Sequence, residues 1–174
     1  LIIEGLPSSS SRGNSDSKLL TVGLAWNPSL KQKALPETSE YVFVVDFSDY
    51  LTSRRLSRLK SCVMYWLHSI PHKSFFNIIA FGDRVLSLFE TGRAYSDQNI
   101  VHAKNFIRDE LESLGEGGGL LEAMKHAFRR GTETKDTLKY VFVVVPESGA
   151  DDGETVLALC DRNSRNSKVF TFGV

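Results

Sequence analysis

From Tyr41 onward, short apolar runs alternate with segments in which apolar positions recur every three or four residues. Residues 41–45 are continuously β-branched and aromatic, which predicts a strand covered on both faces. The spacing in residues 56–70 predicts an amphipathic helix that ends before Pro71. The same criteria predict strands at 75–81, 85–89, 140–145 and 168–172, and helices from Ser96 or Asp97 to Leu114, from Leu120 to Phe128 and around Val156.

The order of these elements predicts the fold class. Strand, helix, strand, hairpin, two helices, strand, helix and strand is typical of an α/β protein with a doubly wound, mostly parallel open sheet and helices on both faces. Residues 85–89 follow a short turn at 82–84, so we expect them to be one antiparallel edge strand. Residues 41–45 and 140–145 have similar sequences and are expected to be two central strands of the sheet.

The first 37 residues differ from the rest of the chain. Residues 8–17 hold six serines and no large apolar side chain, which predicts a flexible loop. Residues 19–26 alternate loosely and predict a strand, followed by a polar connector. We therefore divide the chain into an N-terminal strand and linker region, 1–37, and a main domain, 38–174. Because the chain starts at Leu1 and stops directly after a predicted strand, we expect it to be a segment of a longer protein.

Composition excludes several classes of function. The 174 residues are 41% hydrophobic, enough for one well-buried domain. Because 21 basic residues balance 21 acidic ones, the charge gives no reason to expect a nucleic-acid partner. No apolar run approaches the roughly 18 to 20 residues of a membrane-spanning helix, so we expect no membrane insertion. Cys62 and Cys160 are too few for a disulfide framework and are predicted to be buried free thiols. No asparagine is followed by any residue except Pro and then by Ser or Thr, so the sequence has no N-glycosylation acceptor. The few cysteines and this missing acceptor lean slightly towards an intracellular protein, although the compartment stays unknown.

Candidate chemistry follows the strand ends, because ligands of such sheets bind at the carboxyl ends of the strands. Asp46 ends an otherwise wholly apolar strand. A buried carboxylate without a partner costs several kcal/mol, so Asp46 is expected to have a cation or hydrogen-bond donors beside it. Residues 82–84 and 146–149 follow two other strands and belong to the same edge of the predicted sheet.

Four segments match, in order, the motifs of one protein family. Residues 46–50 (DFSDY) match the first two positions of a D-x-S-x-S motif that follows an apolar strand, and residues 77–83 (NIIAFGD) are similar to that family's second strand. Residues 116–124 (EGGGLLEAM) resemble its glycine-rich turn, and residues 169–174 its later strand. The chain thus resembles the von Willebrand factor A (vWA) domain of the inter-alpha-trypsin inhibitor heavy chain-like type.

The resemblance covers residues 38–174 and implies a vWA, Rossmann-like fold. The final helix and strand of the family have no counterpart before Val174, so we expect a C-terminally truncated domain. Residues 1–37 resemble the end of the VIT-like β-domain that often precedes this module.

The resemblance also implies a metal-ion-dependent adhesion site (MIDAS). In the family, an Asp, two Ser, a Thr and a second Asp surround Mg²⁺ or Mn²⁺, and a partner's carboxylate completes the octahedron. This chain keeps Asp46 and Ser48, but has Tyr50, Gly119 and Pro146 in place of the second Ser, the Thr and the second Asp. We therefore expect a degenerate MIDAS with Asp46 and Ser48 as residual ligands. The structural alternative is that these two residues only serve backbone hydrogen bonds near the first helix.

The loss of three of the five metal ligands favours a protein-interaction module that works without a cofactor. The expected partner-binding rim consists of Asp46, Ser48, Asp49, Tyr50, Gly119 and Glu147. A Mg²⁺- or Mn²⁺-dependent domain, in which Asp49 or Glu147 replaces lost ligands, stays open as one alternative. The other is a phosphohydrolase with Asp46 as nucleophile. That reaction needs a second carboxylate two residues on, where this chain has Ser48, so we expect no enzyme activity.

Overall fold

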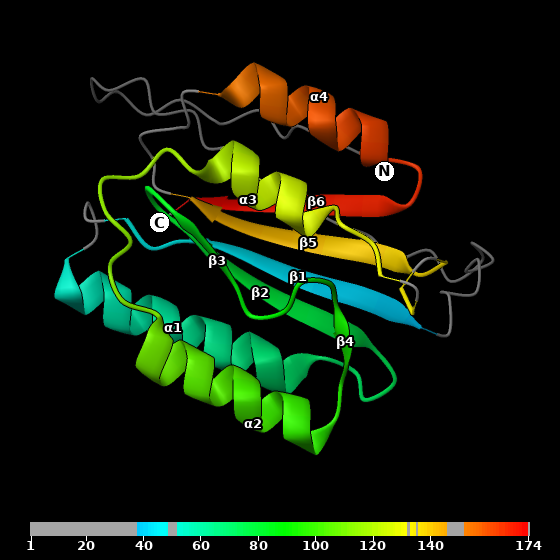
Figure 1. Cartoon of the computed structure of the whole chain (residues 1–174), viewed down its shortest axis with the longest axis horizontal. Helices are drawn as coiled ribbons and strands as arrows, with labels where there is room; N and C mark the ends of the chain where they lie inside the picture. The colour runs from blue at the N-terminus through cyan, green and yellow to red at the C-terminus, as the bar shows by residue number, and fades with distance from the viewer. Residues whose placement is uncertain (1–37, 49–51, 132, 135, 146–151, 174) are drawn as a thin grey trace, which may run out of the picture. The chain divides into compact units, whose positions relative to one another are not determined.

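The computed structural model describes residues 38–48, 52–131, 133–134, 136–145 and 152–173 (Figure 1). The predicted N-terminal strand and linker lie outside these residues, so the proposed division of the chain at residue 37 stays a prediction. The described residues form one sheet with the strand order β3-β2-β1-β5-β6, and β4 pairs with β2. The strands are β1 (Ser39–Asp46), β2 (Phe75–Phe81), β3 (Val85–Ser87), β4 (Arg93–Ala94), β5 (Leu138–Val145) and β6 (Ser167–Gly173). The helices are α1 (Ser53–Ser69), α2 (Asp97–Asn105), the π-helix η1 (Phe106–Glu110), α3 (Leu120–Ala127) and α4 (Gly153–Asn163).

Strands β1 and β5 are central neighbours, as the two apolar runs predict. β1 pairs in parallel with β2 and with β5, so that Val44 faces Ile79 on one side and Val143 on the other. All three of these side chains are buried. β6 pairs in parallel with β5, and β3 pairs antiparallel with β2. The mostly parallel sheet with an antiparallel edge strand is therefore confirmed.

The two faces of the sheet are covered by different helices (Figure 1). One core cluster contains Leu59, Val63 and Leu67 of α1 together with residues of α2. The other contains Ala123 and Met124 of α3, with apolar residues of α4 packed against it. Helices on both faces bury most of β1 and β2, which explains why the sequences of these strands are nearly continuous apolar runs.

The structure departs from the predicted elements in two places. β4 was not predicted, because two exposed residues leave no pattern. The helix expected to reach Leu114 instead ends in the π-helix η1, in which the Leu111 N–H donates to the Phe106 carbonyl. Leu111 and Leu114 are nevertheless buried, so they extend the apolar stripe without being helical. Leu114 contacts the residue that follows β1, because its N–H donates to the Phe47 carbonyl.

The two cysteines are free, as predicted, but half-buried instead of buried. Their partial burial raises the pKa of both thiols. A raised pKa keeps a thiol protonated and unreactive at neutral pH.

A buried ion pair lies at the amino-terminal ends of the central strands. Glu40 of β1 and Lys139 of β5 are register neighbours, and Lys139 Nζ lies 3.1 Å from Glu40 Oε1. Each side chain is only 1% exposed. Lys139 Nζ also donates to the carbonyls of Ala127 and Arg129, at 2.6 Å each. The ammonium group therefore joins β1, β5 and the carboxyl end of α3. Nothing in the sequence pattern had indicated this pair.

None of the described helices is long and apolar enough to cross a membrane.

Candidate interaction site at the carboxyl ends of the strands

Asp46 is the last residue of β1 and lies at the edge where the parallel strands end. Its side chain is 6% exposed. Oδ1 accepts a hydrogen bond of 2.7 Å from the backbone N–H of Ser48. The partner that the buried carboxylate requires is thus at least partly supplied by the chain itself. This contact supports the alternative that Asp46 serves a backbone hydrogen bond near the first helix. Asp46 does not cap that helix itself, because the N-cap of α1 is Thr52, whose hydroxyl accepts from the Arg55 N–H.

Ser48 supplies the second oxygen of the site. Its side chain is buried, and its Oγ has no hydrogen-bond partner among the described residues. A buried hydroxyl is normally satisfied by protein, water or a bound group. The two side chains thus differ, because Asp46 Oδ1 has a hydrogen-bond partner among the described residues and Ser48 Oγ has none.

The glycine-rich turn before α3 forms another wall of the site. Gly115, Gly117 and Gly118 have φ values of 91°, 108° and 103°, a left-handed conformation that side-chain-bearing residues rarely adopt. The Gly117 N–H donates to Asp83 Oδ1 at 3.1 Å. Gly119 follows in an ordinary conformation, with φ of −80°, at the start of α3.

Gly119 has no room for a side chain. A Cβ built on this residue would lie 2.5 Å from the carbonyl oxygen of Gly82, which belongs to the backbone of the β2–β3 turn. Real Cβ atoms essentially never approach an atom this closely. The backbone of residue 82 therefore closes the place where a threonine side chain at position 119 would begin.

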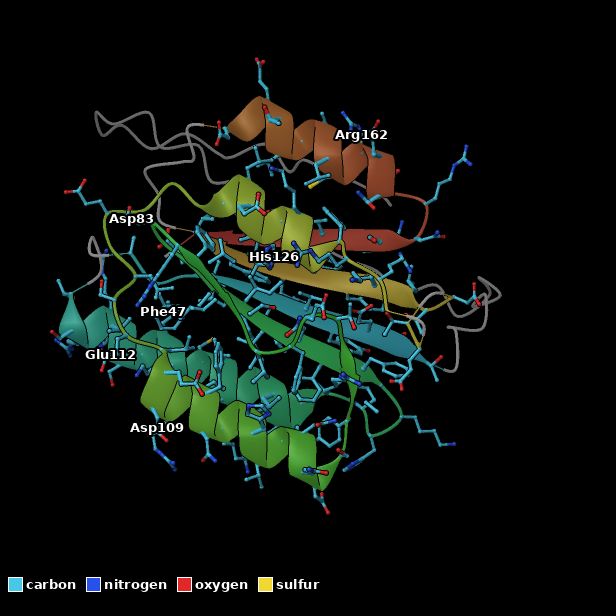
Figure 2. All side chains as sticks on the ribbon, in the orientation of Figure 1. Phe47, Asp83, Asp109, Glu112, His126 and Arg162 are labelled. Carbon is cyan, nitrogen blue, oxygen red and sulfur yellow. The ribbon has the colours of Figure 1, made fainter. Side chains whose placement is uncertain are left out.

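Backbone hydrogen bonds hold these segments against one another. The Phe47 N–H donates to the Phe81 carbonyl, and the Leu114 N–H donates to the Phe47 carbonyl, both at 2.8 Å. The Asp83 N–H then donates to the Leu114 carbonyl at 2.8 Å. Figure 2 shows Phe47 and Asp83 at the same end of the sheet. Sequence reasoning missed the roles of Phe47 and Leu114, because a backbone contact leaves no side-chain signal.

The structure places three residues of the predicted rim at this edge. Asp46 and Ser48 lie together after β1, and Gly119 lies at the start of α3. Asp49, Tyr50 and Glu147 lie outside the described residues, as does Pro146. Their membership of the rim stays a prediction.

Charged side chains of both signs surround the site. Arg54 and Arg55 are exposed in the first turn of α1, which contains no acidic residue. Asp83 and Glu112 are exposed near the other wall (Figure 2). Mixed charges at the rim suit polar contacts with a protein surface, whereas they give no continuous basic surface for nucleic acid.

The described part of the site does not hold the oxygen set of a complete metal centre. Among the described residues, no group of three or more His, Cys, Asp or Glu side chains could hold an ion. The side chains of Asp46 and Ser48 offer three oxygen atoms, and Gly119 offers no side-chain oxygen. A hard divalent cation such as Mg²⁺ takes about six oxygen ligands. The described residues alone therefore do not complete the coordination of the family's metal ion.

A hollow of about 460 Å³ lies between α1 and the carboxyl ends of β5 and β6, and Arg55 and Arg58 belong to its lining. Its walls include Leu59, Cys62, Trp66, Val144 and Phe172. Among the described residues, its lining contains no acidic side chain, so they offer it no carboxylate for a metal ion. The candidate chemistry thus stays with Asp46 and Ser48.

Comparison with known proteins identifies the family. The family model of the von Willebrand factor type A domain matches residues 39–174. The chain therefore belongs to the vWA domain family. A vWA domain-containing protein of Dictyostelium discoideum is 24% identical over 138 residues, which are 79% of this chain and 14% of that protein. Mouse vWA domain-containing protein 5B1 is 24% identical over 135 residues, which are 78% of this chain and 11% of that protein.

Solved structures of low identity share the fold. A vWA protein from Catenulispora acidiphila has a TM-score of 0.65 at 14% identity, over 78% of this chain and 33% of that one. Proximal thread matrix protein 1 from the mussel byssus, with a zinc-occupied MIDAS motif, has a TM-score of 0.61 at 14% identity, over 78% and 35% of the chains. Manganese-loaded Plasmodium vivax TRAP protein has a TM-score of 0.59 at 12% identity, over 79% and 57%. These likenesses confirm the vWA, Rossmann-like fold.

Proposed function

We propose that this vWA domain binds a protein partner at the carboxyl ends of its strands without a bridging metal ion. vWA domains generally mediate protein interaction or adhesion, which supports the class of function. The closed position at Gly119 supports the metal-independent form most directly, because the structure has no space for the missing threonine ligand. The partner would contact the rim of Asp46, Ser48, Asp49, Tyr50, Gly119 and Glu147. An aromatic side chain at position 50 suits this role, since tyrosine is often a contact anchor.

Two finer points belong to the same proposal. We place the chain in the inter-alpha-trypsin inhibitor heavy chain-like type, with a degenerate MIDAS, on the sequence motifs around Asp46 and Gly119. We also propose that the domain is not an enzyme. Asp46 Oδ1 already accepts the Ser48 N–H, and Ser48 stands where a phosphohydrolase would need its second carboxylate.

One observation favours the metal-dependent alternative. The buried Ser48 Oγ lacks a partner among the described residues, as a metal-ligating hydroxyl would in the absence of its ion. Two neighbours in fold carry zinc or manganese. Asp49 or Glu147 would then have to supply the missing oxygens.

A titration with Mg²⁺ and Mn²⁺ separates the two functions. We expect no saturable binding up to millimolar metal by calorimetry, and no metal-induced change in melting temperature. Asp46→Ala should lower the free energy of unfolding by about 1–3 kcal/mol, because it leaves the Ser48 N–H without its charged acceptor. Saturable binding that Asp46→Ala abolishes would establish the metal-dependent alternative instead.

Affinity capture tests the interaction itself. The immobilised chain should retain the same proteins from a lysate in EDTA as in Mg²⁺. Tyr50→Ala should lose them, because it removes the proposed contact anchor. Arg162→Ala is the matched control, since Arg162 is exposed on α4. Equal retention by Tyr50→Ala and Arg162→Ala, or no retention by either variant, would contradict binding at this rim.

A further inference from the structure

The Asp83 carboxylate lies against the glycine-rich turn from a distant part of the sequence. Its Oδ1 accepts the Gly117 N–H at 3.1 Å across a separation of 34 residues. Its backbone N–H donates to the Leu114 carbonyl, directly before the turn. A Cβ at Gly115 would collide with Asp83 Oδ2. The carboxylate thus contacts the turn at two of its glycines.

A turn of this kind needs an external contact to hold one conformation. Glycine loses more conformational freedom on ordering than any other residue, and three of the residues 115–118 are left-handed glycines. Hydrogen bonds to an ionised acceptor are stronger than neutral ones. A carboxylate is therefore an effective acceptor for fixing the Gly117 peptide.

We propose that Asp83 is a positioning residue that fixes the glycine-rich turn, and with it Gly119, beside Asp46 and Ser48. The β2–β3 turn thereby has two roles in the site. Gly82 limits the space at residue 119, and Asp83 fixes the conformation of the glycine-rich turn that leads to that residue. Its effect on partner binding rests on the proposed function. The positioning of the turn does not, and can be measured on the chain alone.

Amide hydrogen exchange by NMR tests the positioning on the full chain. In Asp83→Ala, the Gly117 amide should exchange about tenfold faster than in wild type, because its charged acceptor is lost. Asp83→Asn keeps an acceptor oxygen and should give a smaller acceleration, about threefold. Glu112→Ala removes another exposed acid of this region and should leave the Gly117 exchange unchanged. The Ser48 amide, bonded to Asp46, should exchange at the wild-type rate in every variant.

Unchanged Gly117 exchange in Asp83→Ala would overturn the proposal. Equal acceleration at Gly117 and Ser48 would also overturn it, because that pattern indicates general destabilisation. Where Asp83→Ala fails to fold, the Asn variant still decides, since a neutral acceptor must leave Gly117 less protected than in wild type.

Capture then measures the consequence for binding. Asp83→Ala should retain less of the proteins that wild type binds, and Asp83→Asn should recover part of the loss. If Asp83→Ala and Asp83→Asn retain the proteins as well as wild type does, Asp83 has a structural role only and no effect on partner binding. If wild type itself retains nothing, the proposed function fails, while the exchange experiment still decides whether Asp83 fixes the turn.

Discussion

Replacing Lys139 by methionine should lower the free energy of unfolding by about 3–5 kcal/mol, the cost of removing one partner of a buried ion pair. Methionine fills much of the aliphatic volume, so the loss would be mainly electrostatic. It would leave the Glu40 carboxylate buried without the ammonium group that it contacts, and the remaining positive charge that favours its ionised form would be that of Arg130. It would also remove the donor to the Ala127 and Arg129 carbonyls.

The deficit should depend on pH in a defined direction. Burial raises the pKa of Glu40 even beside Lys139, and removing the ammonium would raise that pKa further. A group whose pKa is raised in the folded state favours folding at low pH, and that contribution is lost as pH rises through the folded pKa. The Lys139→Met variant should therefore approach wild-type stability as the pH falls and Glu40 becomes protonated.

Urea denaturation at several pH values measures both effects. Glu40→Gln with Lys139→Met is the control, because it removes the stranded charge and should be more stable than Lys139→Met alone at neutral pH. A single variant within about 1 kcal/mol of wild type at neutral pH would show that the pair does not stabilise the fold.

Much of the fold follows from the sequence for simple physical reasons. The middle parts of β1 and β5 are covered by helices on both faces, so residues 41–45 and 140–145 are apolar and the strands are visible as runs. The stripe through Leu59 and Val63 is visible because α1 buries one face only. The candidate site was found through Asp46, since a carboxylate at the end of an apolar strand is unusual and the glycines after Glu116 mark a turn.

Other features depend on contacts between distant residues and could not be predicted. Glu40 and Lys139 stand 99 residues apart, and only the parallel register of β1 and β5 makes them neighbours. β4 consists of two exposed residues with no periodicity. At the site, the sequence showed that Gly119 lacks the expected oxygen. It could not show that the Gly82 carbonyl occupies the space that a side chain would need.

Gly119→Thr restores the residue type that the vWA motif has at this position, yet it should destabilise the domain by about 2–3 kcal/mol. The backbone at Gly119 has φ of −80°, so the expected cost arises from space and not from backbone strain. The new Cβ would begin 2.5 Å from the Gly82 carbonyl oxygen, and a backbone atom cannot rotate away as a side chain can. Forcing extra atoms into a closed position typically costs about 1–3 kcal/mol.

Gly153→Thr is the matched control for this substitution. No described residue lies within 4 Å of a Cβ at Gly153, so the same change should alter the free energy of unfolding by less than about 1 kcal/mol. Denaturant unfolding of the two variants compares the costs directly. Equal stability of Gly119→Thr and wild type would show that the β2–β3 turn moves aside readily.

The same variant decides whether the metal site could be regained by restoring its ligands. Because a threonine at position 119 must first displace Gly82, we expect Gly119→Thr to bind no Mn²⁺, even though Asp46 and Ser48 are in place. Adding Tyr50→Ser and Pro146→Asp should not change this result, since neither substitution opens the space beside the Gly82 carbonyl. Mn²⁺ binding by the triple variant, abolished by Asp46→Ala, would show instead that the ligands alone were missing. The proposed metal independence of the natural domain would then rest on ligand loss, and not on the closed backbone at Gly119.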